Sequence, residues 1–119
     1  MKIIFVCSGN TCRSPLAESI AKSLLPNDSI ASRGLFAVEG QAISKESLEL
    51  IHKYGLPEPS LAQTFRIDDL DADIILTMTQ AHKDLIFSIY GRQSNVFTLN
   101  EYVGDTQEID DPFGGSFDV

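Results

Sequence analysis

The sequence predicts an α/β fold in which a central four-stranded parallel sheet carries helices on both faces, within one domain over residues 1–119. Two observations predict it. Four short apolar segments alternate with segments whose apolar residues recur at helical spacing, which is the pattern of consecutive β-α-β units. The chain has 119 residues, 43% of them hydrophobic, which is enough for one core and too short for two.

The first strand and helix are predicted from the start of the chain. Residues 2–6 form a continuous apolar run, typical of a strand buried on both faces. A helix is expected to begin with Ser14 as N-cap and Pro15 at the first helical position, and to end at 26–28. Its expected inward positions are Leu16, Ala17, Ile20, Ala21, Leu24 and Leu25.

The next elements are a strand at 29–33 and a helix that begins at Ser44 and ends at Gly55. The apolar positions of this helix are Leu48, Leu50, Ile51 and Tyr54. The acidic run at 68–73 is expected to be a solvated helix or turn before the following strand.

The second half of the chain continues the alternation. A buried strand is predicted at 73–78, a helix from Thr79 to Tyr90 and a last strand at 95–99. The side chains of this helix that are expected to face the core are Ala81, Leu85, Ile86 and Ile89. Parallel strands joined in this way need right-handed crossovers, and their ligands bind beyond the carboxyl ends of the strands. Cys7 follows the first strand at this edge.

Residues 7–14 read Cys-Ser-Gly-Asn-Thr-Cys-Arg-Ser and link the first strand to the first helix. The backbone N–H groups of such a loop, at the positive end of a helix, can bind a tetrahedral dianion. Arg13 adds a planar fork of donors, and Cys7 would lie below the phosphorus of a bound phosphate as a thiolate nucleophile that Ser14 supports. The expected phosphate-binding residues are Ser8, Gly9, Asn10, Thr11, Cys12 and Arg13.

The spacing of this motif favours function over a structural role for Cys7. An isolated buried cysteine is usually inert. Cysteine, five residues, arginine and then serine or threonine arises by chance on the order of once in a hundred chains of this size. A preceding strand and a following helix start make coincidence rarer. A nucleotide-binding P-loop is excluded, because no Gly-Lys-Ser/Thr follows.

A second motif, at residues 110–114, supplies a candidate general acid, Asp111. Pro112 restricts the backbone of Asp111 to extended conformations and so directs its carboxyl group. An adjacent carboxylate and a bound dianion would both favour the protonated acid. Asp-Pro alone is ordinary turn chemistry, so the functional interpretation depends on the cysteine loop.

Together, these motifs resemble the low molecular weight protein tyrosine phosphatases. Residues 6–15 are similar to that family's phosphate loop, and residues 111–113 are similar to its Asp-Pro-aromatic acid loop. Residues 32–34 and 72–78 also resemble family segments, so the match covers essentially the whole chain.

The resemblance implies a two-step mechanism without a metal or any other cofactor. Cys7 would take the phosphoryl group while Asp111 protonates the leaving atom and then activates water. Arg13 and the loop amides would stabilise the transition state. Cys12 resembles a second loop cysteine that can form a disulfide with the nucleophile, although a spectator thiol is the alternative.

Thr11 bears on the substrate. Relatives that act on phosphotyrosine usually carry an aliphatic residue there, whereas the loop here is more similar to that of bacterial protein-arginine phosphatases. We therefore predict phosphoarginine in proteins as the substrate, with phosphotyrosine as the alternative. Phe36 and Phe113 are candidate walls along the substrate stem, and Phe36 could equally belong to a satellite core.

Proteins of other classes are less consistent with the sequence. An arsenate reductase of similar fold needs further cysteines downstream, and none follows Cys12. A sugar-transport phosphocarrier would not need Arg13 or Asp111. A non-catalytic phosphoprotein-binding module would tolerate loss of nucleophile, arginine or acid, and all three are present. His52 and His82 match no motif and receive no role.

Charge and cysteine content limit the partners and the compartment. The chain has 9 Lys plus Arg against 17 Asp plus Glu, a net charge of −8, which argues against nucleic-acid or membrane partners. Six of the acidic residues and no basic residue lie at 100–119, so the excess surrounds Asp111. Two cysteines are too few for a disulfide-rich secreted domain, and a zinc site would need both histidines to converge on both thiols.

The two ends of the chain give two further expectations. The apolar start at 3–6 is too short for a signal peptide or a membrane span, so a reduced, cytoplasmic chain is expected. Relatives usually continue past the acid loop into a final helix, whereas this sequence stops at Val119. We therefore expect either a truncated chain, with apolar sheet surface exposed and a mobile Asp111, or a face covered in another way.

Overall fold

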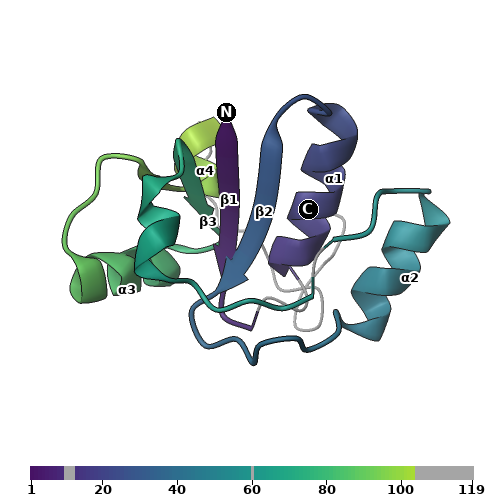
Figure 1. The fold of residues 1–119 in the computed structure, drawn as a ribbon, viewed down its shortest axis with the longest axis horizontal. Helices are drawn as coiled ribbons and strands as arrows, with labels where there is room; N and C mark the ends of the chain where they lie inside the picture. The colour runs from purple at the N-terminus through teal and green to yellow at the C-terminus, as the bar shows by residue number, and fades with distance from the viewer. Residues whose placement is uncertain (10–12, 60, 104–119) are drawn as a thin grey trace.

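A computed structural model describes residues 1–9, 13–59 and 61–103, and it contains the predicted parallel sheet (Figure 1). The strands lie in the order β2-β1-β3-β4, and every neighbouring pair is parallel. Their bounds agree with the predicted runs to within two residues: β1 (Lys2–Cys7), β2 (Ser29–Gly34), β3 (Ile74–Thr77) and β4 (Val96–Thr98). All four carboxyl ends therefore meet at one edge of the sheet.

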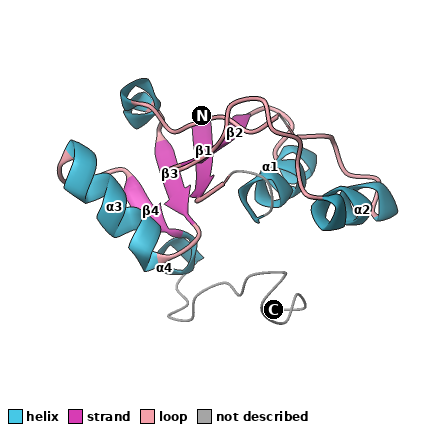
Figure 2. Ribbon diagram, turned by 90° about the horizontal axis from the view of Figure 1, so that it is seen from below, coloured by secondary structure: helices cyan, strands magenta, loops and turns pink. Residues whose placement is uncertain are grey.

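Helices cover both faces of the sheet, as predicted. Figure 2 shows α1, α2 and α4 on one side and α3 with the 3-10 helix η1 on the other. Their bounds are α1 (Arg13–Leu24), α2 (Lys45–Lys53), η1 (Ile67–Asp71), α3 (Gln80–Tyr90) and α4 (Leu99–Val103). Helix α4 is absent from the sequence prediction, which extends the last strand to residue 99. In the described part of the chain, no helix is both long and apolar enough to span a bilayer.

Two hydrophobic clusters hold these layers together, because successive strand residues point to opposite faces. The first cluster lies toward α1 and α4 and contains Ile3, Phe5, Cys7, Ala21, Ile30, Leu76 and Met78. The second lies toward α3 and η1 and contains Ile4, Val6, Phe65, Ala72, Ile75, Ile86 and Val96. Cys7 is therefore part of the first core as well as the last residue of β1.

The start of α1 differs from the prediction. The helix begins at Arg13, so Ser14 is not its N-cap and Pro15 is its third residue. Proline is tolerated there because the N–H groups of the first turn have no partner within the helix. Ser14 is fully buried instead, and its hydroxyl is used in a contact with Cys7.

The predicted inward face of α1 is also partly wrong. Ile20, Leu24 and Leu25 are 42%, 73% and 41% exposed, whereas Ser14 and Glu18 are fully buried. The exposed three help to line an open apolar groove of about 390 Å³ with Phe5, Ala17, Ala21 and Leu99. Periodicity located the apolar stripe correctly, but part of it lies in this open groove beside Phe5 of β1. Ser14 and Glu18 are buried through polar contacts with Cys7 and Ser32.

Two other helices bury fewer predicted positions than expected. In α2, Ser44 is the N-cap as predicted, and Ile51 is buried, but Tyr54 is 64% exposed at the helix end. In α3, Ile86 is buried, whereas Ala81 and Ile89 are exposed. A polar residue, His82, takes the buried place one turn earlier. The acidic run forms η1, yet Asp69 within it is buried rather than solvated.

Candidate active site

Cys7 ends β1 at the centre of the sheet, where parallel strands on both sides hold it. Its partner in β2 is Gly34, and the preceding residue, Val6, pairs with Arg33 and Thr77. The Cys7 carbonyl accepts a 2.9 Å hydrogen bond from the N–H of Leu35. The side chain is only 3% exposed and its thiol is free. The backbone of this residue is thus fixed at the edge where ligands of such sheets bind.

Ser14 brings the first turn of α1 onto the Cys7 thiol. The two side-chain atoms, Cys7 Sγ and Ser14 Oγ, lie 2.8 Å apart and are buried. A helix N-terminus favours negative charge nearby, because its N–H groups point toward it. Arg13, the first residue of α1, is half-buried beside Ser14. The structure therefore brings together two of the predicted site residues, Cys7 and Ser14, and Arg13 adjoins Ser14 in the chain.

Other predicted site residues fall outside the described part of the chain. They are Asn10, Thr11, Cys12, Asp111 and Phe113. Ser8 and Gly9 are described, and Ser8 is exposed while Gly9 is half-buried. The loop is thus described at its two ends, which join β1 and α1.

A histidine that the sequence analysis left without a role contacts this loop. His82 lies in the first turn of α3 and is 7% exposed. Its Nε2 lies 3.0 Å from Ser8 Oγ, and its Nδ1 lies 3.1 Å from Oγ1 of Thr79, the N-cap of α3. The sequence does carry a signal for this position. Helix α3 follows β3, a parallel neighbour of β1, so α3 starts at the same edge of the sheet as the Cys7 loop.

Phe36 flanks the loop on the β2 side. Its N–H donates to the carbonyl of Ser8 at 2.9 Å, while its side chain is 70% exposed. This exposure contradicts the satellite-core alternative for Phe36.

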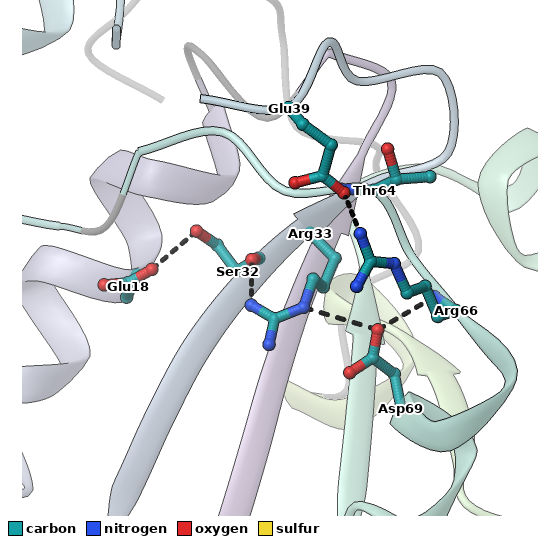
Figure 3. Close-up of polar contacts among 7 residues, drawn as sticks. All are labelled: Glu18, Ser32, Arg33, Glu39, Thr64, Arg66 and Asp69. Carbon is teal, nitrogen blue, oxygen red and sulfur yellow. Dashed lines mark hydrogen bonds and ion pairs between the residues drawn. The ribbon is translucent and has the colours of Figure 1, made fainter. Parts of the chain in front are cut away.

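A polar network anchors the segment that carries Phe36 (Figure 3). The Glu39 carboxylate accepts hydrogen bonds from the N–H of Thr64 at 3.0 Å and from Arg66 Nη2 at 2.6 Å. The Thr64 N–H, assisted by the Arg66 charge, holds the pKa of Glu39 below its ordinary value of 4.5. The Thr64 hydroxyl also donates to the carbonyl of Ala37. Residues 37–39 are therefore tied to residues 64–66.

Arg33 and Asp69 extend this network to η1. Arg33 Nε lies 3.3 Å from Asp69 Oδ2, and the same oxygen accepts from the N–H of Arg66 at 2.9 Å. Both side chains are largely buried. The pair therefore ties the end of β2 to η1.

The described geometry can support one kind of chemistry. A buried thiol lies against a hydroxyl at a helix N-terminus, with an arginine beside it. Such surroundings stabilise a thiolate and a bound oxyanion together. The exposed residues Ser8 and Phe36 follow β1 and β2 beside this thiol and are joined by a backbone hydrogen bond.

Comparison with known families supports the same interpretation. The family described as "Low molecular weight phosphotyrosine protein phosphatase" matches residues 2–119. The chain is 95% identical over 119 residues to a protein of Staphylococcus epidermidis named "Low molecular weight protein-tyrosine-phosphatase PtpB". That alignment covers 100% of this chain and 86% of the relative.

Solved structures with the same fold carry a different substrate in their titles. One, titled "YwlE arginine phosphatase - C7S mutant with phosphorylated active site serine", is 38% identical with a TM-score of 0.91, and the match covers 99% of this chain and 82% of that one. A second, the YwlE arginine phosphatase of Geobacillus stearothermophilus, is 35% identical with a TM-score of 0.89 and coverage of 98% and 79%.

Proposed function

Because the chain belongs to the low molecular weight phosphotyrosine protein phosphatase family, we propose that it dephosphorylates proteins through a phosphocysteine at Cys7. The observation that carries the proposal is the buried Cys7 thiol, which lies 2.8 Å from Ser14 Oγ at the start of α1. A nucleophile needs such a setting, because the thiolate rather than the thiol attacks phosphorus. We place this chemistry in the cytoplasm, where thiols are kept reduced.

The proposed reaction has two steps. In the first, Cys7 Sγ forms a bond to phosphorus as the bond to the leaving atom breaks, and Asp111 gives that atom a proton. In the second, Asp111 takes a proton from water, the hydroxide attacks phosphorus, and the sulfur–phosphorus bond breaks to release inorganic phosphate. Arg13 and the amides of residues 8–13 stabilise the equatorial oxygens. Ser14 supports the thiolate as it leaves.

For the substrate, we propose phosphoarginine in proteins. The support is Thr11, whose hydroxyl can bond a guanidinium or the attacking water, whereas an aliphatic residue would favour an aromatic ring. The two solved structures named arginine phosphatases also support it. Phosphotyrosine is the second candidate, favoured by the name of the Staphylococcus epidermidis relative. Phe36, exposed beside Ser8, and Phe113 would contact the substrate stem in either case.

The substrate proposal predicts a preference that depends on Thr11. Matched peptides carrying phosphoarginine or phosphotyrosine are compared by kcat/KM, first with the natural chain and then with Thr11→Ile. We expect the natural chain to prefer phosphoarginine. One hydroxyl contact contributes about 1 kcal/mol, so the substitution should shift the ratio toward phosphotyrosine by about fivefold or more.

Two results would contradict this prediction. If the natural chain prefers the phosphotyrosine peptide, the protein is a tyrosine phosphatase. An unchanged ratio in the Thr11→Ile variant removes Thr11 from substrate choice. Thr106→Ile is the matched control, since it makes the same chemical change outside the loop, and it should leave the ratio unchanged.

The covalent route predicts that the Cys7→Ser variant loses turnover but still binds inorganic phosphate. A serine hydroxyl is a weak nucleophile without a base, so kcat should fall by about a thousandfold or more. Inorganic phosphate should still bind, because the loop amides and Arg13 remain, and calorimetry measures this directly. A Cys7→Ser protein that binds phosphate and still turns over at the natural rate would exclude the phosphocysteine intermediate.

A further inference from the structure

His82 is a buried histidine outside the proposed catalytic residues. It lies 74 positions from Ser8 in the sequence, yet its Nε2 and Ser8 Oγ are 3.0 Å apart. Ser8 directly follows Cys7, so this contact reaches the residue beside the proposed nucleophile. A buried imidazole is costly unless its polar atoms have partners, and here each ring nitrogen lies within hydrogen-bond distance of a hydroxyl.

The contact is separate from those that hold the sheet together. β1 and β3 are joined by backbone pairing, and the N–H of Met78 donates to the carbonyl of Val6 at 2.9 Å. The backbone of Ser8 is held from the β2 side, where its carbonyl accepts from Phe36. His82 holds the Ser8 side chain from the β3 side. Ser8 is thus fixed by segments that follow both neighbouring strands.

The protons of the three groups favour one arrangement. Thr79 Oγ1 already accepts from the N–H of His82 as the helix cap, so its own hydrogen is available for His82 Nδ1. In the tautomer with its proton on Nε2, the ring donates to Ser8 Oγ. The Ser8 hydroxyl keeps its hydrogen for a further acceptor, and a phosphoryl oxygen in the adjacent loop is one.

We propose that His82 is a positioning residue for the phosphate loop, acting through the hydroxyl of Ser8. It orients the residue after the nucleophile and connects the N-terminus of α3 to the loop. The inference rests on the proposed function only in that the Cys7 loop binds phosphate, whichever phosphoprotein is the substrate.

Three variants separate the two contacts of His82. His82→Asn has an amide that reaches the position of Nδ1 and so keeps a partner for Thr79, but it is too short for Ser8. His82→Gln has an amide that reaches the position of Nε2 and restores a partner for Ser8. Ser8→Ala removes the hydroxyl itself, at an exposed site where it should not affect folding. The double variant His82→Asn with Ser8→Ala completes a cycle.

The readouts are the dissociation constant of inorganic phosphate by calorimetry and kcat and KM on both phosphopeptides. We expect His82→Asn and Ser8→Ala each to raise the dissociation constant of phosphate about three- to tenfold, as loss of one hydrogen bond does. The double variant should be no weaker than either single one, because both remove the same interaction. His82→Gln should bind phosphate within about twofold of the natural chain.

Ile86→Val is the matched control in the same helix. Ile86 is fully buried but packs in the second hydrophobic cluster, so its loss of a methyl group should lower stability without changing phosphate affinity. The proposal is overturned if His82→Asn lowers only the unfolding midpoint, as Ile86→Val does, or if the effects of His82→Asn and Ser8→Ala multiply. A natural chain that binds phosphate but hydrolyses neither peptide contradicts the proposed function, and the phosphate affinities still decide the role of His82.

Discussion

Glu18 shows how a single buried carboxylate attaches the first helix to the sheet. Its side chain is fully buried, and Ser32 Oγ donates to it at 2.6 Å (Figure 3). Lys22 Nζ lies 2.6 Å from its other oxygen. A buried charge is tolerated only with such partners. Since α1 also carries Ser14, the position of this helix affects the Cys7 thiol.

Replacement of Glu18 by alanine should therefore destabilise the protein. The change leaves the Ser32 hydroxyl buried without this acceptor, and we expect a loss of about 1–3 kcal/mol in the free energy of unfolding. Glu18→Gln keeps the shape and an acceptor for Ser32, so its loss should be smaller. Urea denaturation at neutral pH measures both.

Glu49→Ala provides the comparison for this residue. It removes the same side chain from an exposed position on α2, where the effect should stay within about 0.5 kcal/mol. If Glu18→Ala costs no more than Glu49→Ala, the buried carboxylate does not anchor α1.

At the scale of an element, α4 owes its start to a reciprocal pair of caps. The N–H of Thr98 donates to Glu101 Oε1 at 2.8 Å, and the N–H of Glu101 donates to Thr98 Oγ1 at 3.0 Å. This is the capping box of a threonine and a glutamate three residues later, a signal that is visible in the sequence. Lys83 of α3 also lies 2.8 Å from Glu101, so the cap joins two helices.

This cap predicts a stability that depends on pH. Two hydrogen bonds lower the pKa of Glu101 from its ordinary value of 4.5, and the one from Lys83 has a larger effect than the one from the Thr98 N–H. A carboxyl group whose pKa is lower in the folded protein stabilises it above the unfolded pKa, and this contribution is lost as the pH falls through the folded value. The difference in unfolding free energy between the natural chain and Glu101→Gln should thus be present at pH 7 and smaller at pH 3, below the ordinary value of 4.5.

The size of this effect is limited because Glu101 is 45% exposed, and surface pairs contribute less than about 1 kcal/mol. Chemical denaturation at the two pH values measures it, with Glu49→Gln as a control for loss of an exposed carboxylate. A difference that is equal at pH 7 and pH 3 would show that the charge of Glu101 does not support α4.

For the molecule as a whole, the parallel sheet explains why distant segments meet at Cys7. The carboxyl ends of all four strands share one edge, so the segments after β1, β2 and β3 all begin there. They supply Ser14 from α1, Phe36 from the loop after β2 and His82 from α3. A phosphate site at this edge can therefore be supported from both sides of the central strand.

The whole-molecule charge has a local origin. The net charge is −8, but residues 1–99 contribute only −2, because the acidic excess lies at 100–119. A uniformly acidic surface is thus not a property of the sheet and its helices. In the proposed function, this excess near Asp111 would help to keep that acid protonated and to attract the cationic surroundings of an arginine.

Local patterns in the sequence predicted most of the fold and the centre of the site. The four apolar runs and the helix starts near Ser44 and Thr79 depend on residues close together in the chain, and the strands and helices lie where these patterns indicated. The N-cap predicted at Ser14 is the exception, because α1 begins at Arg13. The capping box of α4 is equally local, but it overlaps the apolar run at 95–99, which predicts a strand.

The sequence by itself thus determined the order of strands and helices, the placement of Cys7 at a carboxyl edge and the family. Only the tertiary structure decided which side of α1 faces the sheet, that Asp69 is buried against Arg33, and that His82 reaches Ser8. The physical reason is that these contacts join residues far apart in the sequence. Helical periodicity reports an apolar stripe, but the partner of a buried polar group is set by which strands are neighbours, here β2-β1-β3-β4.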